Sequence, residues 1–228
     1  MKYFKLSLVF VLVAITLLVG MQSTAHALQL GFNDYTNPVF YVNDNSPQDS
    51  NSLVGVITYS GPIGANWIVN VTTGISKPIL GSADAPQLDL NSVNVTSASG
   101  GHLRFGLVDS GYNGPTSGGV AGPFTWEVGG TTSGSISFDA FGNPSNTDQF
   151  IGTIFGSLGP FSGGAYSGTV SGSFSATGPF ALGIIADITH TGGGATSFDV
   201  GVSVPEPMSL LLLGCGLVGL CAVRRKRS

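Results

Sequence analysis

Apolar and polar residues alternate along most of this chain, in short runs that end at glycine, proline, asparagine or serine. The clearest run is 181–190, in which Leu182, Ile184 and Ala186 occupy every second position, and 197–204 repeats the pattern. Because the side chains of a strand point alternately to its two faces, this period of two predicts strands with one buried face.

Eight more runs have the same character, and turn-forming residues separate them. They occupy 53–60, 66–74, 88–96, 102–109, 124–130, 135–141, 148–156 and 167–177. The segment 189–197, between the last two strands, is glycine-rich and predicts a hairpin loop. Helix-period patterns are scarce. About ten short strands predict an all-β fold, an antiparallel two-sheet sandwich for which a jelly roll is one candidate arrangement.

The beginning of the chain breaks this pattern with a longer apolar run. Two lysines precede the run 6–19, and the small residues Ala25 and Ala27 then flank a cleavage site before Leu28. A basic start, an apolar middle and a small-x-small site predict a secretory signal peptide at 1–27. A retained membrane anchor is the alternative, although a run of about 14 residues is shorter than the roughly 20 that span a bilayer.

The other end combines three parts in a fixed order. Pro205, Glu206 and Pro207 come first, and the prolines hold the backbone around the acid extended. An uncharged run at 208–223 follows, near the lower length limit of a transmembrane helix. The chain then closes on the basic residues Arg224, Arg225, Lys226 and Arg227. Because basic residues tend to stay on the cytoplasmic side, this cluster predicts that the preceding domain lies outside.

The three parts together, at 205–228, resemble the PEP-CTERM sorting signal of Gram-negative bacteria. The resemblance implies processing near the Pro-Glu-Pro tripeptide by an exosortase, a membrane-embedded transpeptidase-like enzyme of bacteria that make exopolysaccharide. We therefore expect export through the secretory translocon, transient anchoring in the inner membrane, and arrival at the cell surface or in a biofilm matrix. The domain at 28–204 also looks like the Gly/Ser/Thr-rich exported domains of such proteins. A plain single-span anchor is the alternative.

Charge and composition narrow the function of the exported segment. It contains two basic residues, Lys77 and Arg104, against eleven acidic ones, a net charge of −9. Nucleic-acid binding is excluded, because phosphate contacts need clustered lysine or arginine. Both cysteines lie in the tail at 208–223, so the exported segment has neither a disulfide nor a thiol nucleophile.

Catalytic motifs are lacking: the chain has no G-x-S-x-G, H-E-x-x-H or P-loop sequence. His102 and His190 each lie at a strand end, where an exposed or loop-packing role is the default. Glu127, beside Trp126, has the acid-plus-aromatic surroundings that glycoside hydrolysis favours, but an outward acid next to an inward tryptophan is the simpler interpretation. Trp67 and Trp126 likewise fit a core better than a sugar-binding platform.

Calcium is the small ligand that the acidic residues suggest. Asp44 and Asp49 lie in an oxygen-rich loop at 42–51, and Asp109 begins a second such segment at 109–114. Neither matches the twelve-residue EF-hand pattern, so solvated turns are the alternative, and we expect no other cofactor.

The sequence therefore predicts a non-enzymatic surface or extracellular-matrix protein, associated with exopolysaccharide and sorted by an exosortase. A carbohydrate- or calcium-binding adhesion module is the first alternative. An extracellular hydrolase is the second, and it would require convergent acids in a cleft.

Overall fold

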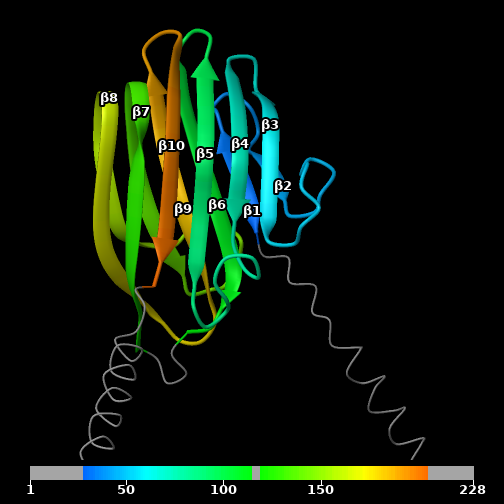
Figure 1. Ribbon diagram of the computed structural model, residues 1–228, viewed down its shortest axis with the longest axis vertical. Helices are drawn as coiled ribbons and strands as arrows, with labels where there is room; N and C mark the ends of the chain where they lie inside the picture. Colours follow the sequence, from blue (N-terminus) through cyan, green and yellow to red (C-terminus); the bar gives the residue numbers. More distant parts are fainter. Residues whose placement is uncertain (1–27, 115–118, 205–228) are drawn as a thin grey trace, which may run out of the picture.

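A computed structural model describes residues 28–114 and 119–204, and these residues form strands and turns without a helix (Figure 1). The strands are β1 (Gln29–Asn33), β2 (Phe40–Asn43), β3 (Val56–Ile63), β4 (Trp67–Ile75), β5 (Gln87–Ser97), β6 (Gly101–Tyr112), β7 (Gly119–Asn143), β8 (Thr153–Ala176), β9 (Phe180–His190) and β10 (Gly194–Ser203). The protein is thus all-β, as the alternation predicted.

All strand pairs are antiparallel, in the order β2-β1-β6-β9-β7-β10-β5-β4-β3, with β8 paired to β7. This single sheet folds over on itself because β7 belongs to both of its halves. Residues 125–132 of β7 pair with β10, whereas residues 135–143 pair with β9. The result is a sandwich with a β2-β1-β6-β9 layer facing a β3-β4-β5-β10 layer.

Four U-turns join the two layers at one end of the sandwich. The β5–β6 and β9–β10 connections are two of them, and bends within β7 and β8 are the others. At the β7 bend, a side chain on Gly134 would collide with the carbonyl oxygen of Thr189, so only glycine allows the two strands to approach. Figure 1 shows β8 arching over at the edge of the sandwich.

The core lies between the layers and is rich in phenylalanine. Phe198 of β10 meets Phe105 of β6 and Phe138 of β7, with ring centroids 5.9 and 5.3 Å apart. Phe32 of β1 reaches Tyr59 of β3 at 5.2 Å. Each of these contacts crosses from one layer to the other. Every second residue of the strands faces this core, which explains the period of two in the sequence.

Three features differ from the sequence-based expectation. The predicted hairpin at 189–197 is wrong: β9 and β10 do not pair with each other but with β7, β6 and β5. The runs at 124–130 and 135–141 are the two arms of one strand, β7, and the runs at 148–156 and 167–177 likewise both fall in one strand, β8, which begins only at Thr153. Strands β1 and β2 were not predicted, because their five and four residues are too short to establish a period.

The predicted signal peptide and C-terminal segment lie outside the described residues. Within the described part of the chain, no helix has the length and apolar character needed to cross a bilayer.

A second, smaller apolar cluster covers the outer face of the β2-β1-β6-β9 layer. Val108, Phe141 and Ala181 are buried there, and Phe150 and Ile185 pack against them. Phe150 comes from the β7–β8 connection, which therefore folds across the outside of the sheet rather than away from it. This connection forms one wall of a groove on that outer face.

Candidate functional site

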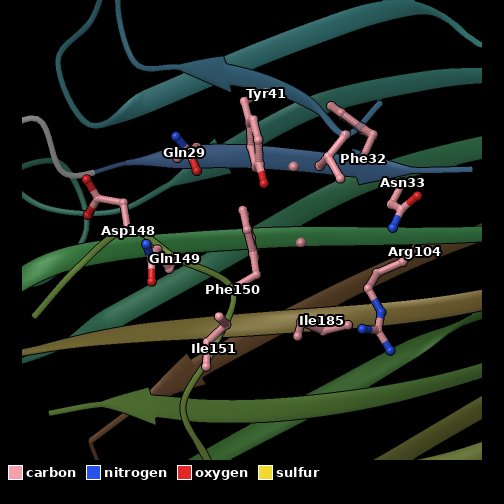
Figure 2. Close-up of a pocket in the computed structure, with 13 residues that line it drawn as sticks. Gln29, Phe32, Asn33, Tyr41, Arg104, Asp148, Gln149, Phe150, Ile151 and Ile185 are labelled. Atoms are coloured by element: carbon pink, nitrogen blue, oxygen red, sulfur yellow. The ribbon is translucent and has the colours of Figure 1, made fainter. Parts of the chain in front are cut away.

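A groove of about 590 Å³ runs along the outer face of β1 and β6. Its walls are the segment around Tyr41 of β2 and the β7–β8 connection, and Ile185 of β9 lies at one side. Figure 2 shows these elements around the groove. The volume is within the usual range of small-ligand sites, which is about 300–1,000 Å³.

Two glycines make the floor of the groove. Gly31 of β1 and Gly106 of β6 are paired in the sheet, and the ring of Phe150 lies directly on them. A β-carbon on Gly31 would stand 2.6 Å from the Phe150 ring, and one on Gly106 would also overlap it. The glycines are thus required for a close approach of an aromatic ring to the sheet, not for an unusual backbone conformation.

Two aromatic rings stand side by side above this floor. Tyr41 and Phe150 have ring centroids 6.1 Å apart and planes within 12° of parallel. Tyr41 is 46% exposed, so part of this residue is accessible to a ligand. In Figure 2 both rings occupy the middle of the groove.

Polar side chains lie on both sides of the rings. Gln29, Asp148 and Gln149 are on one side, and Asn33 and Arg104 are on the other (Figure 2). Gln29 also donates a hydrogen bond to Asn43 at 2.6 Å, which orients its amide. The groove therefore offers amide donors and acceptors at each end of an aromatic platform.

Arg104 is held in place by a carboxylate of the neighbouring strand. Its Nε and Nη2 atoms each donate to one oxygen of Asp187, both at 2.9 Å. This bidentate hydrogen bond raises the pKa of Arg104 above its usual value, so the guanidinium stays charged. The Tyr35 hydroxyl donates to the same carboxylate at 3.3 Å. The remaining N–H groups of Arg104 are available to a ligand in the groove.

A second hollow, of about 420 Å³, lies on the outer face of the opposite layer. Its lining includes three acids, Asp89 of β5, Glu127 of β7 and Asp199 of β10. Asp89 and Glu127 flank Gly201 in register on the two sides of β10. Burial raises the pKa of Asp89, and the charge of Asp199 raises it further. Glu127 points outward beside the buried Trp126, as the sequence indicated.

The predicted calcium ligands Asp44 and Asp49 have protein partners. Asp44 Oδ2 accepts the Gly55 backbone N–H at 2.7 Å. Asp49 Oδ1 accepts those of Asn51 and Thr58, both at 2.9 Å. These carboxylates fasten the β2–β3 connection to its surroundings. Calcium binding stays an untested prediction.

The third predicted ligand, Asp109, is fully buried in β6. Its Oδ2 atom lies 2.7 Å from Lys77 Nζ and also accepts the Ser76 hydroxyl. The Lys77 ammonium lies 4.1 Å from the ring centroid of Tyr112. Among the described residues, none is a hydrogen-bond partner of Asp109 Oδ1. Within the described ranges, no group of three or more His, Cys, Asp and Glu residues could hold a metal ion.

The tryptophans and histidines are structural in character. Trp67 and Trp126 are 2% and 0% exposed, so their predicted place in the core is confirmed. His102 is exposed and contacts the Thr189 hydroxyl. His190 is buried between two hydroxyls, with Nδ1 2.7 Å from Ser97 Oγ and Nε2 2.8 Å from Thr196 Oγ1.

The arrangement around His190 does not suit nucleophilic catalysis. Both ring nitrogens face hydroxyl groups, so no carboxylate orients the imidazole as in a catalytic triad. The ring is also only 3% exposed, which keeps a substrate away from Ser97. The cluster serves to satisfy buried polar groups where the layers meet at the U-turns.

Comparison with known proteins assigns the chain to no family. No family model matches the chain, and no curated protein matches it. Among solved structures, a chain in the structure of infectious bursal disease virus, Gx strain, aligns with 12% identity and a TM-score of 0.25. The alignment covers 82% of this chain and 53% of that one, so this chain spans about half the length of the viral protein. A similarity this weak carries no argument about function.

The residues of the groove were not singled out from the sequence. They come from β1, β2, β6, β9 and the β7–β8 connection, and only the folded sheet brings them together. The one available signal was Phe150, an aromatic residue preceded by Asp148 and Gln149 in a run that was assigned to a strand.

Proposed function

We propose that this protein is an exported, non-enzymatic surface or matrix protein that binds polysaccharide in the groove between Tyr41 and Phe150. The observation that carries the proposal is the accessible aromatic pair with polar side chains on both sides. Aromatic rings stack against the C–H faces of sugar rings, and the amides of Gln29 and Asn33 supply donors and acceptors for hydroxyl groups.

A neutral polysaccharide fits the charge of the domain better than an acidic one. The segment 28–204 carries a net charge of −9, which repels an anionic polymer at low salt. Arg104 supplies a positive charge at the groove, but Asp187 balances it. The groove therefore selects hydroxyl-rich rather than carboxylate-rich sugars.

Sorting by the C-terminal signal completes the proposal. Strand β10 ends at Ser203, and the predicted processing motif follows at Pro205–Pro207. An exosortase that acts there would leave all ten described strands on the exported product. The proposal therefore joins translocon-dependent export, transient anchoring in the inner membrane of a Gram-negative bacterium, and release to the exopolysaccharide outside.

The test of the groove is affinity electrophoresis of the protein through gels that contain a neutral or a uronic-acid polysaccharide. We expect retardation by the neutral polymer, and we expect Tyr41→Ala to weaken binding about two- to tenfold, the effect of one aromatic contact. Ile68→Ala is the control, because Ile68 of β4 is 61% exposed on the opposite layer and does not line the groove. Equal losses in both variants, or no retardation at all, would refute the groove as the binding site.

An extracellular hydrolase is a second candidate, and one observation favours it. Asp89 and Glu127 flank Gly201, and the pKa of Asp89 is raised. Glycoside hydrolysis pairs an acid of raised pKa with an ionised carboxylate. If this hollow is catalytic, the protein releases reducing ends from the polysaccharide, and Glu127→Gln abolishes the release without affecting retardation in the gel.

A further inference from the structure

Strand β8 forms a bare edge of the sandwich in both layers. It pairs with β7 and with no other described strand, and it follows β7 through the bend from one layer into the other. An edge strand leaves every second pair of backbone N–H and C=O groups without a strand partner. With 24 residues, β8 is far longer than the edge strand β2, which has four.

The sequence of β8 lacks the usual protection of an edge. Natural edge strands carry lysine or other charged side chains that prevent pairing with another chain. No charged residue or histidine occurs between Asp148 and Asp187, a stretch that contains the whole of β8. Its single proline, Pro160, lies near the bend and leaves the arm 164–176 free of proline.

The opposite edge of the sandwich is partly covered in the β3 layer. Strand β3 ends the layer on that side, and the β2–β3 connection contacts it at Thr58. Thr58 of β3 donates its backbone N–H to Asp49 Oδ1 at 2.9 Å and accepts the Ser50 N–H at 2.9 Å. The backbone groups that β3 would offer to another strand are therefore already used at this point. Of the edges in the described part of the chain, β8 is the long unprotected one.

We propose that β8 pairs with β8 of a second copy of this chain, antiparallel and about a two-fold axis. The occupant is a second copy because the domain is strongly acidic elsewhere, with a net charge of −9. Two such domains approach with least repulsion along their uncharged edges, and an antiparallel pair of identical strands is self-complementary. Because a two-fold pairing uses the same edge of both copies, it closes as a dimer and does not continue into a fibre.

The test is native mass spectrometry of the exported protein at 1 to about 50 μM, a range that resolves weak dimers. We expect a dimer in the wild type and a monomer in the double variant Ser167→Lys, Ser171→Lys. Both serines are exposed on the outer face of β8, so the substitutions add charge to the edge without entering the core. The control is Asn94→Lys, Thr96→Lys on β5, which lies between β4 and β10 and adds the same charge away from an edge.

Each outcome decides the proposal. A dimer that survives in the β5 variant and is lost in the β8 variant, with unchanged melting temperatures, supports it. A monomeric wild type, equal loss of the dimer in both variants, or an open series of larger assemblies overturns it. Tyr41→Ala should leave the dimer intact, so failure of the groove as a polysaccharide site and failure of edge pairing are distinguishable.

Discussion

At the scale of single residues, the most consequential contact joins the domain's one lysine to a carboxylate that the solvent does not reach. Lys77 and Asp109 connect the β4–β5 segment of one layer to β6 of the other. Breaking a buried ion pair by removing one partner leaves an uncompensated charge, which costs about 3–5 kcal/mol. Asp109 Oδ1 already lacks a hydrogen-bond partner in the part of the chain that the structure describes, so little else there can compensate for the lost charge.

We therefore predict that Lys77→Met lowers the free energy of unfolding by about 3–5 kcal/mol in urea titrations. The double variant Lys77→Met, Asp109→Leu should recover much of the loss, because it removes both charges. A single variant as stable as the wild type would show that the pair is not buried as described.

His190 makes the stability of the domain depend on pH. Burial lowers the pKa of His190 below its usual value of 6.5, so the folded state resists the proton that the unfolded chain accepts. Stability should fall as the pH drops from 7.5 to 5.5, by at most about 1.4 kcal/mol per pH unit. Thermal melting of the wild type and of His190→Gln measures this, and an equal slope in both would contradict it.

At the scale of elements, the position of the Phe150 ring depends on the two glycines of β1 and β6 that leave the sheet surface flat beneath it. We predict that Gly106→Ala displaces the Phe150 ring from its contact with the sheet. The variant should lower the free energy of unfolding by about 1–3 kcal/mol and weaken polysaccharide binding. Gly129→Ala is the control, since its new β-carbon would meet no atom closer than 3.9 Å. Thermal melting and gel retardation of both variants provide the measurement, and identical behaviour would argue against the ring–glycine contact.

The sequence predicted strands well and their connections poorly. Alternation located the buried positions of β9 and β10, because one face of each packs on the core. It divided β7 in two, since Ser133 and Gly134 interrupt the alternation where the strand crosses between layers. The sequence also predicted a hairpin at the β9–β10 turn, because a glycine-rich loop is equally compatible with a hairpin and with a U-turn between layers.

The candidate site lay beyond prediction for a different reason. Tyr41 and Phe150 become neighbours only through the pairing of β2 with β1, β1 with β6, and the return of the β7–β8 connection across them. Period-two alternation carries no information about which strands pair. The acidic residues that the sequence did single out, Asp44 and Asp49, instead accept backbone N–H groups of the β2–β3 connection and of β3.

At the scale of the whole molecule, we propose that the domain and the segments before and after it have separate tasks. The described strands begin at Gln29 and end at Ser203, and the predicted cleavage motifs lie just outside this range. We predict that replacing Pro205–Pro207 by alanines leaves a membrane-bound precursor, seen by fractionation and immunoblotting. The same amount of released protein in the variant and the wild type would contradict sorting through this motif.

The most direct test of the proposed function is the intact mass of the protein that remains bound to the exopolysaccharide of its native host after washing. The proposal predicts a chain that begins at Leu28 and ends near Pro205–Pro207, with or without a group attached to the new terminus. A bound chain that retains Met208–Ser228, or the absence of this protein from the polysaccharide fraction, would contradict it.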